Sequence, residues 1–365
     1  MTELLQSPLH GRHAAAGAKF AEFGGWSMPL EYTGVLAEHT AVRERVGIFD
    51  VSHLGKALVT GPAALAYLNT RLTNDLRKVT AGQAQYTMLC DKSGGVVDDL
   101  IAYVTSDERV FLIPNAANTT EVVRRLREGM PEGVEIENQH GDHAVLAVQG
   151  THSDEVLTAV GLPVGMDYMQ FAEAEYEGIP LTVCRTGYTG ERGYEIVVGA
   201  DDAGVVWDAL VAAGEPHGLA LCGLAARDTL RTEMGYPLHG NDLSLEISPV
   251  QASAGWAVGW KKESFDGSAA LKSERKAGPR RVLRGLKAQG RGIPRHGMEV
   301  VTETGDPAGV VTSGTFSPTL KQGIGLALID PAIEVGSVVG VVVRNRTELF
   351  DVVKPPFVSP GVRES

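Results

Sequence analysis

Two adjacent carboxylates occupy a segment that otherwise has the apolar character of a β-strand. Residues 94–101 read GGVVDDLI, and side chains along a strand alternate between its two faces. Asp98 is therefore expected on the face of Val96, and Asp99 on the face of Val97, so the two carboxylates should point apart and not act as one acid–base pair. A carboxylate in apolar surroundings must be hydrogen-bonded or carry a raised pKa. The pattern fits a catalytic carboxylate and a strand-edge aspartate that caps N–H groups equally well.

Another carboxylate follows a glycine-rich turn. Residues 187–197 read GYTGERGYEIV, and the same alternation places Glu195 on the face of Val197. A fixed carboxylate can accept two parallel N–H bonds from a flat donor edge, such as an arginine or a 2-aminopyrimidinone ring. An internal ion pair explains the pattern too and is slightly favoured by the residues alone.

An arginine lies within the apolar stripe of a predicted helix. Residues 223–235 have glycine at both ends, and leucine and methionine side chains at helical spacing surround Arg227. An unpaired guanidinium in this position is costly, so Arg227 needs a carboxylate from the protein or from a ligand. Asp228 and Glu233 project elsewhere, and we expect them to be solvated. A structural salt bridge to Arg227 stays a competing explanation.

Composition and motifs exclude several other kinds of chemistry. The formal net charge of −12 disfavours a general nucleic-acid binder, because phosphate contacts need clustered lysine and arginine. The three cysteines form no C-x-x-C pair and the ten histidines form no H-E-x-x-H motif, so we expect neither a disulfide framework nor a metal site. Phosphate-loop, dinucleotide-binding and G-x-S-x-G motifs are also absent.

The sequence gives no sign of membrane insertion or export. The most apolar region, near the C-terminus, is interrupted by Asp330 and Glu334 and is too short to span a bilayer. Residues 1–13 contain neither an apolar signal core nor an arginine-rich amphipathic pattern. We therefore expect a cytoplasmic protein that does not bind membranes.

Helical and strand patterns alternate irregularly before residue 273. Apolar residues three or four apart predict helices, and short alternating or apolar runs predict strands. Because these elements do not repeat as β–α–β units, we expect an α+β fold with antiparallel sheets. The predicted helices span residues 62–72, 119–128 and 201–213, and the predicted strands span 96–105, 144–149, 181–185 and 194–198.

The C-terminal part of the chain has a different pattern. Residues 273–279 are polar and end in Gly-Pro, which suits a domain boundary. Beyond them, six short runs separated by Gly, Asp and Pro predict a small β-barrel or sandwich. These runs span residues 282–287, 298–301, 310–313, 324–329, 338–344 and 349–353.

Several further motifs lie around the segments described above. They are FGGWSMPL at 23–30, GIFDVSH at 47–53, ISP at 247–249, TSGTFSP at 312–318, RNR at 344–346 and KPPFV at 354–358. With the carboxylate and arginine segments, they occur in an order that resembles the glycine cleavage system T-protein (aminomethyltransferase) family. The resemblance runs from about Leu9 to Val358, and the ordered set is highly specific although each motif alone is weak.

This resemblance implies a three-domain α+β fold with antiparallel sheets around a central folate cavity. Residues 1–275 would form a folate-binding region of two interleaved domains, approximately 1–52 with 145–275, and 53–144. Residues 280–365 would form a C-terminal β-barrel domain.

The resemblance also implies a reaction. The enzyme would take an aminomethyl group from the dihydrolipoyl arm of H-protein, release ammonia and form 5,10-methylenetetrahydrofolate. Tetrahydrofolate would be the co-substrate, lipoylated H-protein would be the partner that supplies the lipoyl group, and no metal would be needed.

Residue by residue, the resemblance assigns Asp98 as the catalytic aspartate. Arg227 would meet the glutamyl tail of folate or balance the charge of Glu195. His53 lies in a family motif, and we expect it to be structural. The residues expected to bind folate or line its cavity are Glu195, Arg227, Tyr86, Asn115 and Tyr188.

Two alternatives share the same fold. One is another folate-dependent transferase or demethylase that acts on a small methylated amine or sulfonium compound. The other is a folate-binding protein of iron–sulfur cluster maintenance, which carries Lys-Gly-Cys-Tyr-x-Gly-Gln where this chain has YPLHGND at 236–242. This difference, and the position of Cys222 outside that stretch, disfavour the second alternative.

Overall fold

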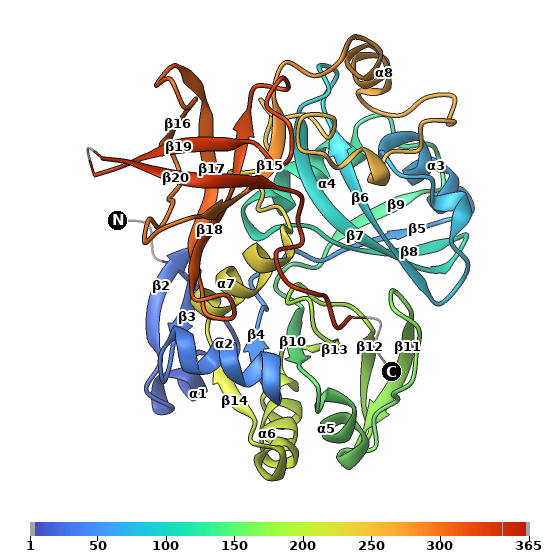
Figure 1. Cartoon of the computed structure of the whole chain (residues 1–365). Coiled ribbons are helices and arrows are strands. Elements are labelled where there is room, and N and C mark those ends of the chain that lie inside the picture. Colours follow the sequence, from blue (N-terminus) through green and yellow to red (C-terminus); the bar gives the residue numbers. More distant parts are fainter. Residues whose placement is uncertain (1–3, 345, 363–365) are drawn as a thin grey trace.

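Three open β-sheets and one closed β-barrel make up most of the molecule (Figure 1). The computed structural model describes residues 4–344 and 346–362. Asn345 of the motif at 344–346, and residues 363–365 of the predicted barrel domain, lie outside the described residues. The sheets are mostly antiparallel and are covered by helices, which confirms the predicted α+β class.

The six-stranded sheet combines strands from distant parts of the chain. All neighbouring pairs are antiparallel except β14 and β4. On one face, Ile196 packs against Trp207 and Leu210 of α6, while the other face carries Val197 with Glu195 beside it, as alternation predicts. The strands in spatial order are β11 (Phe171–Tyr176), β12 (Ile179–Cys184), β13 (Gly193–Gly199), β10 (His143–Gln149), β4 (Gly47–Asp50) and β14 (Ala220–Cys222), and the helices are α5 (Ser153–Ala159) and α6 (Ala203–Gly214).

The five-stranded sheet is antiparallel throughout and packs against two helices that fall on predicted runs. Leu68 of α3 and Leu126 of α4 are fully buried against Leu100 and Val104 of β7. The strands in spatial order are β6 (Gln83–Cys90), β7 (Val96–Ser106), β8 (Arg109–Ile113), β5 (Ala57–Thr60) and β9 (Glu135–Asn138), and the helices are α3 (Ala64–Arg71) and α4 (Thr119–Arg127).

The closed barrel confirms the predicted C-terminal β-structure. Its strand β17 extends beyond the predicted run 310–313 at both ends; towards the C-terminus it continues through Thr315 and Ser317, whose buried hydroxyl groups an apolar pattern does not detect. The strands around the barrel are β15 (Val282–Ala288), β18 (Gln322–Ile329), β17 (Pro307–Ser317), β16 (Glu299–Val301), β19 (Val338–Val343) and β20 (Arg346–Val353).

Helix α7 (Leu224–Met234) joins the parts of the molecule. It begins after Gly223 and ends at the left-handed Gly235, as the sequence predicts, and it contacts α2, β3 and β17 (Figure 1). The remaining elements are a sheet in the order β1 (Leu5–Gln6), β3 (Trp26–Glu31), β2 (Lys19–Phe23), the helices α1 (His10–Ala15), α2 (Val35–Glu44) and α8 (Ser268–Ala277), and 3₁₀ turns at Leu76–Lys78, Ala116–Asn118, Glu215–His217 and Gly255–Ala257.

The sheets draw on separate stretches of the chain. Strands of the six-stranded sheet come from residues 47–50 and 143–222, whereas those of the five-stranded sheet come from residues 57–138. We propose that these sheets mark the two interleaved domains predicted as 1–52 with 145–275, and 53–144, and that the barrel marks the domain predicted as 280–365.

Glu233 fastens α7 to α2 and to the barrel. Its buried carboxylate accepts hydrogen bonds from Ser317 at 2.5 Å and Thr319 at 3.0 Å, and it pairs with Arg43 at 2.8 Å and His39 at 3.3 Å. The prediction that Glu233 is solvated is wrong, because residues far away in sequence supply its partners. Burial alone would raise the pKa of Glu233, but His39, Ser317 and Arg43 hold this pKa at about 2.

Glu233→Ala should lower the free energy of unfolding by about 3 kcal/mol, because it removes a partner from the nearly buried Arg43 guanidinium. Denaturant unfolding at pH 7 measures this loss. Since the folded-state pKa is depressed, the contribution should be present above about pH 4 and disappear as the pH falls towards 2. Glu121→Ala, which removes an exposed pair on α4, is the control and should leave unfolding unchanged. Equal effects of the two substitutions would contradict this role of Glu233.

Candidate active site

A cavity of about 940 Å³ lies between the six-stranded sheet, the five-stranded sheet, α7 and the barrel. This volume is within the range of small-molecule sites. Asp98 is fully buried and does not line the cavity, although its neighbour Asp99 does. The other five predicted site residues all line it: Glu195, Arg227, Tyr86, Asn115 and Tyr188.

Glu195 is held in the cavity wall by a hydroxyl group. Its Oε2 accepts a 2.6 Å hydrogen bond from Thr186, whose hydroxyl lies 3.1 Å from that of Tyr103. The residue is only 5% exposed, yet no basic side chain in the described part of the chain forms an ion pair with it. The internal ion pair favoured by the sequence is therefore not formed, and the second carboxylate oxygen is free to accept from a ligand.

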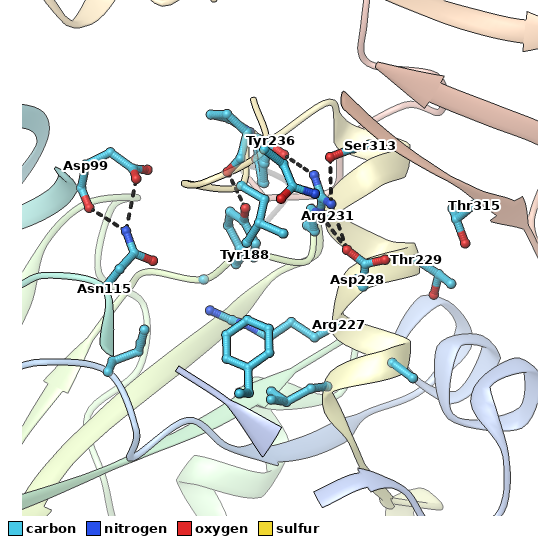
Figure 2. A pocket seen from close by; sticks show the side chains of 18 of the residues that line it. Asp99, Asn115, Tyr188, Arg227, Asp228, Thr229, Arg231, Tyr236, Ser313 and Thr315 are labelled. Carbon is cyan, nitrogen blue, oxygen red and sulfur yellow. Dashed lines mark hydrogen bonds and ion pairs between the residues drawn. The ribbon is translucent and has the colours of Figure 1, made fainter. Parts of the chain in front are cut away.

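Arg227 projects from α7 into the same cavity with an unpaired nitrogen. Its Nη1 is buried and has no hydrogen-bond partner among the described residues. The guanidinium lies over the ring of Tyr188, 4.8 Å from the ring centroid (Figure 2). Burial lowers the pKa of Arg227, and the charge of Glu195 opposes this shift. Because a guanidinium stays protonated in proteins, Nη1 is a buried donor that no acceptor among the described residues satisfies.

Arg231, one turn along α7, has all the partners that Arg227 lacks. It pairs with Asp228 at 2.7 Å and Asp242 at 3.1 Å, and it donates to Ser313 at 3.0 Å and to the Tyr236 carbonyl at 3.1 Å (Figure 2). Asp228, expected to be solvated, is about half exposed and paired. These bonds connect α7, the following segment and the barrel, so they fix one wall of the cavity.

The segment 236–242 covers another part of the cavity. The hydroxyl of Tyr188 donates to the carbonyl of Pro237, and the rings of Tyr188 and Tyr236 stack with centroids 5.7 Å apart. Asp242 accepts a 2.9 Å hydrogen bond from the backbone of Leu238, which closes the segment into a tight loop. Burial raises the pKa of Tyr188, so its hydroxyl stays protonated and acts as a donor.

Strand β7 contains a bulge immediately before Asp98. Leu89 of β6 pairs with Asp98, but Cys90 pairs with Val96, so Val97 has no partner across the pair. Val97 consequently joins the core beneath α3 and α4, while Val96 packs on the other side. The faces predicted for Val96 and Val97 are therefore exchanged, because one extra residue inverts the alternation.

Asp98 and Asp99 are bridged by one side-chain amide. Asn115 Nδ2 lies 3.0 Å from Asp99 Oδ1 (Figure 2). The same nitrogen lies 2.9 Å from Asp98 Oδ1, and the Asn115 backbone donates to Asp98 Oδ2 at 2.9 Å. The prediction that the two carboxylates point apart is wrong, because both contact the same donor. Burial, and then the charge of Asp99, raise the pKa of Asp98 well above its usual value, and burial also raises the pKa of Asp99. Both shifts favour the protonated form of the pair relative to ordinary aspartates.

Asn118 is a neighbour of this pair that the sequence analysis missed. Its Nδ2 donates to Asp98 at 2.7 Å and lies 2.9 Å from Nδ1 of His239. Asn115 and Asn118 bracket a 3₁₀ turn, in which side chains three residues apart lie on the same side. The Asn-x-x-Asn spacing was therefore a usable signal, whereas nothing in the sequence linked His239 to Asp98.

Tyr86 connects the carboxylates to the mouth of the cavity. Its hydroxyl donates to Asp99 Oδ2 at 2.9 Å, and its ring stacks on Trp256 with centroids 5.2 Å apart. Burial raises the pKa of Tyr86, which keeps this donor protonated. Trp256 was not predicted, because an isolated tryptophan carries no spacing signal.

Comparison with known proteins identifies the family. Residues 9–262 match the family described as GCVT N-terminal domain, and residues 281–359 match the Glycine cleavage T-protein C-terminal barrel domain. The chain belongs to the glycine cleavage T-protein family. It is 60% identical over 365 residues to the Aminomethyltransferase of Parafrankia sp. (strain EAN1pec), covering 100% of both chains. It is 58% identical over 363 residues to the Aminomethyltransferase of Mycobacterium tuberculosis (strain ATCC 25618 / H37Rv), covering 99% of each.

A solved structure supports the same T-protein assignment. The crystal structure of glycine cleavage system aminomethyltransferase T from Bartonella henselae matches with a TM-score of 0.92 and 34% identity, over 98% of this chain and 99% of that chain. The present T-protein is thus an aminomethyltransferase, a one-carbon transferase, with the predicted fold. Across residues 4–344 and 346–362, no helix combines the length and apolar character needed to cross a membrane.

His53 of this T-protein is buried in the wall beside Arg227. Burial, and then the charge of Arg227, lower the pKa of His53 to about 3, so its imidazole is neutral at physiological pH. Its ring contacts Phe23 edge-on, with centroids 5.3 Å apart. A neutral ring avoids a second positive charge at this wall; His53 lines the cavity, and its structural role stays a prediction.

Arg227→Met should raise the free energy of unfolding of the ligand-free enzyme by about 1–3 kcal/mol, because a buried donor without a partner is removed. Arg231→Met is the matched control on the same helix, and it should lower stability by about 3 kcal/mol by leaving Asp242 unpaired. Urea unfolding of both variants measures these changes. A comparable loss in the two variants would mean that Arg227 is structural and not held for a ligand.

Proposed function

We propose that this enzyme transfers the aminomethyl group of a lipoyl-bound donor, carried by an H-protein, to tetrahydrofolate. Ammonia leaves and 5,10-methylenetetrahydrofolate forms, with tetrahydrofolate as co-substrate and no metal required. The observation that carries this proposal is that one cavity is lined by both a fixed carboxylate, Glu195, and a guanidinium, Arg227, whose Nη1 has no hydrogen-bond partner among the described residues. We also propose a cytoplasmic location for the reaction.

Glu195 has the geometry that a reduced pteridine requires. Thr186 fixes one carboxylate oxygen, so the group keeps its orientation without a neutralising counter-ion. The 2-amino group and adjacent ring N–H of a pteridine form a flat pair of donors, which a carboxylate accepts in the same way as it accepts an arginine. Arg227 then supplies a donor to an oxygen of the same ligand, and Tyr188 provides an aromatic surface beside it.

The carboxylate pair supplies acid–base chemistry beside the folate site. Asp99 and Asn115 line the cavity, and Asp98 is joined to both through the Asn115 amide. We assign Asp98 as the catalytic aspartate of the family; because it does not line the cavity, we propose that its negative charge acts through Asn115 and Asp99 to orient the folate amines and to stabilise developing positive charge. Holding the two reactants in line supplies the larger effect, about 7–11 kcal/mol of the activation barrier.

The mouth of the cavity suits an apolar arm delivered by a carrier protein. Four large apolar side chains that line the cavity are exposed: Phe23 at 41%, Leu30 at 38%, Leu36 at 58% and Trp256 at 69%. Exposed apolar groups around a site mark a binding surface. The hydrocarbon and sulfur part of a lipoyl arm matches this rim, and sulfur packs favourably against an indole.

Asp98→Asn should reduce tetrahydrofolate-dependent ammonia release from aminomethylated H-protein at least about tenfold, because the amide can neither accept a proton nor carry negative charge. The expected thermal unfolding curve is that of a folded protein. Asp208→Asn, which removes an exposed partner of Arg12, is the control and should keep full activity. Full activity of the Asp98 variant would remove Asp98 from the mechanism, and ammonia release without tetrahydrofolate would overturn the proposed reaction.

Glu195→Gln should weaken tetrahydrofolate binding about 10–100-fold, because one acceptor of the charged pair becomes a donor that opposes the pteridine N–H groups. Titration calorimetry with tetrahydrofolate measures the change. Glu173→Gln, on an exposed position of the same sheet, should bind as the unchanged enzyme does. Unaltered affinity in the Glu195 variant would place the pteridine elsewhere.

A further inference from the structure

A chain of hydrogen bonds through the side chains of His239 and Asn118 connects the backbone of β7 to the buried Asp98. Its Nε2 lies 3.1 Å from the carbonyl oxygen of Val96, and its Nδ1 lies 2.9 Å from Nδ2 of Asn118. The same Asn118 nitrogen donates to Asp98 Oδ1 at 2.7 Å. His239 itself does not line the cavity, so it cannot touch a substrate there.

The directions of these hydrogen bonds are fixed by chemistry. A carbonyl oxygen only accepts, so Nε2 of His239 carries the proton in its bond to Val96. In the neutral ring Nδ1 is then an acceptor, and it receives one hydrogen of the Asn118 amide. The second amide hydrogen points to Asp98. Both hydrogens of Asn118 Nδ2 are thus used, and His239 determines which end of the amide faces the carboxylate.

We propose that His239 is a positioning residue of the reaction, which acts through Asn118 to keep an N–H donor on the ionised carboxylate of Asp98. The inference rests on the catalytic role assigned to Asp98 under the proposed function. A neutral histidine that accepts from Asn118 disfavours the flipped amide, in which oxygen would face both Nδ1 and the carboxylate. Without His239 the flipped amide becomes accessible, and Asp98 then loses one of its three N–H donors.

The predicted consequence is a change in the acidity of Asp98. The groups around its carboxylate are Asp99, whose charge raises its pKa, and the donors of Asn115 and Asn118, which lower it. Burial raises the pKa of Asp99, whereas His239 and the hydroxyl of Tyr86 lower it and so favour the charged form of that neighbour. Burial and the charge of Asp99 raise the pKa of Asp98, and the Asn118 donor is one of the groups that lower it. Loss of this donor should therefore increase the pKa of Asp98.

The test is the pH profile of kcat for tetrahydrofolate-dependent ammonia release in His239→Ala and His239→Asn. Since Asp98 acts when ionised, loss of a donor should move the acid limb of His239→Ala to higher pH by about one unit. KM for tetrahydrofolate should change less than about twofold, because the pteridine contacts are elsewhere. His239→Asn retains an acceptor for Asn118 without an imidazole, so its acid limb should return towards that of the unchanged enzyme.

Further variants guard against a general loss of structure. Asn118→Ala should reproduce the shifted limb, and the double variant with His239→Ala should add nothing, because both act on one hydrogen bond. His152→Ala, at an exposed ion pair with Glu155, should leave the profile unchanged. An unshifted limb in folded Asn118→Ala and His239→Ala, or additive effects in the double variant, would overturn the inference.

These outcomes separate the inference from the proposed function. If the unchanged enzyme releases ammonia with tetrahydrofolate and Asp98→Asn is impaired, but the His239 variants keep the original limb, only the role of His239 fails. If Asp98→Asn is fully active, the proposed function of Asp98 fails first.

Discussion

A guanidinium buried in a cavity wall without a hydrogen-bond partner on Nη1 constrains the whole site. Such a group is costly in a folded protein unless a ligand completes its bonding. The surroundings of Arg227 reduce this cost without removing it. The Tyr188 ring lies beneath the positive charge, and the negative charge of Glu195 stabilises it without forming an ion pair. His53 is neutral and so adds no second positive charge. We therefore propose that the cavity is preorganised for a ligand that offers both a flat donor edge and an oxygen acceptor.

Helix α7 shows how the fold keeps the Arg227 guanidinium in place although its Nη1 has no hydrogen-bond partner among the described residues. Arg231 and Glu233 on the same helix are buried with complete sets of partners from α2, the segment 236–242 and the barrel. These saturated charges hold the helix in place, so that Arg227 keeps its position although its own guanidinium is not anchored. The barrel therefore contributes directly to the site, because Ser313 and Ser317 bind the charges that fix α7.

The residues that could be predicted from sequence are those whose position follows from local periodicity. Alternation placed Glu195 correctly because β13 pairs without a bulge, and helical spacing placed Arg227 correctly on the inward stripe of α7. The same reasoning failed at Val96 and Val97, because a bulge is a property of two paired strands. It also failed for Glu233, whose partners come from Arg43 and the barrel, since periodicity carries no information about distant segments.

The cavity itself could not be derived from residue patterns, because its walls come from segments separated by up to hundreds of residues. Tyr86 and Trp256, or Asn118 and His239, meet only once the sheets have packed. The resemblance to T-proteins supplied the expectation of a central cavity, and the structure supplied the contacts that give each residue a chemical role to test.

A crystal structure of the enzyme with bound tetrahydrofolate would test the central claim most directly. The pteridine 2-amino group and its neighbouring ring N–H should lie about 2.7–3.2 Å from the carboxylate oxygens of Glu195, with a folate oxygen within the same distance of Arg227 Nη1. A ligand bound outside the cavity, or a Glu195–Arg227 ion pair with no folate contact, would contradict it.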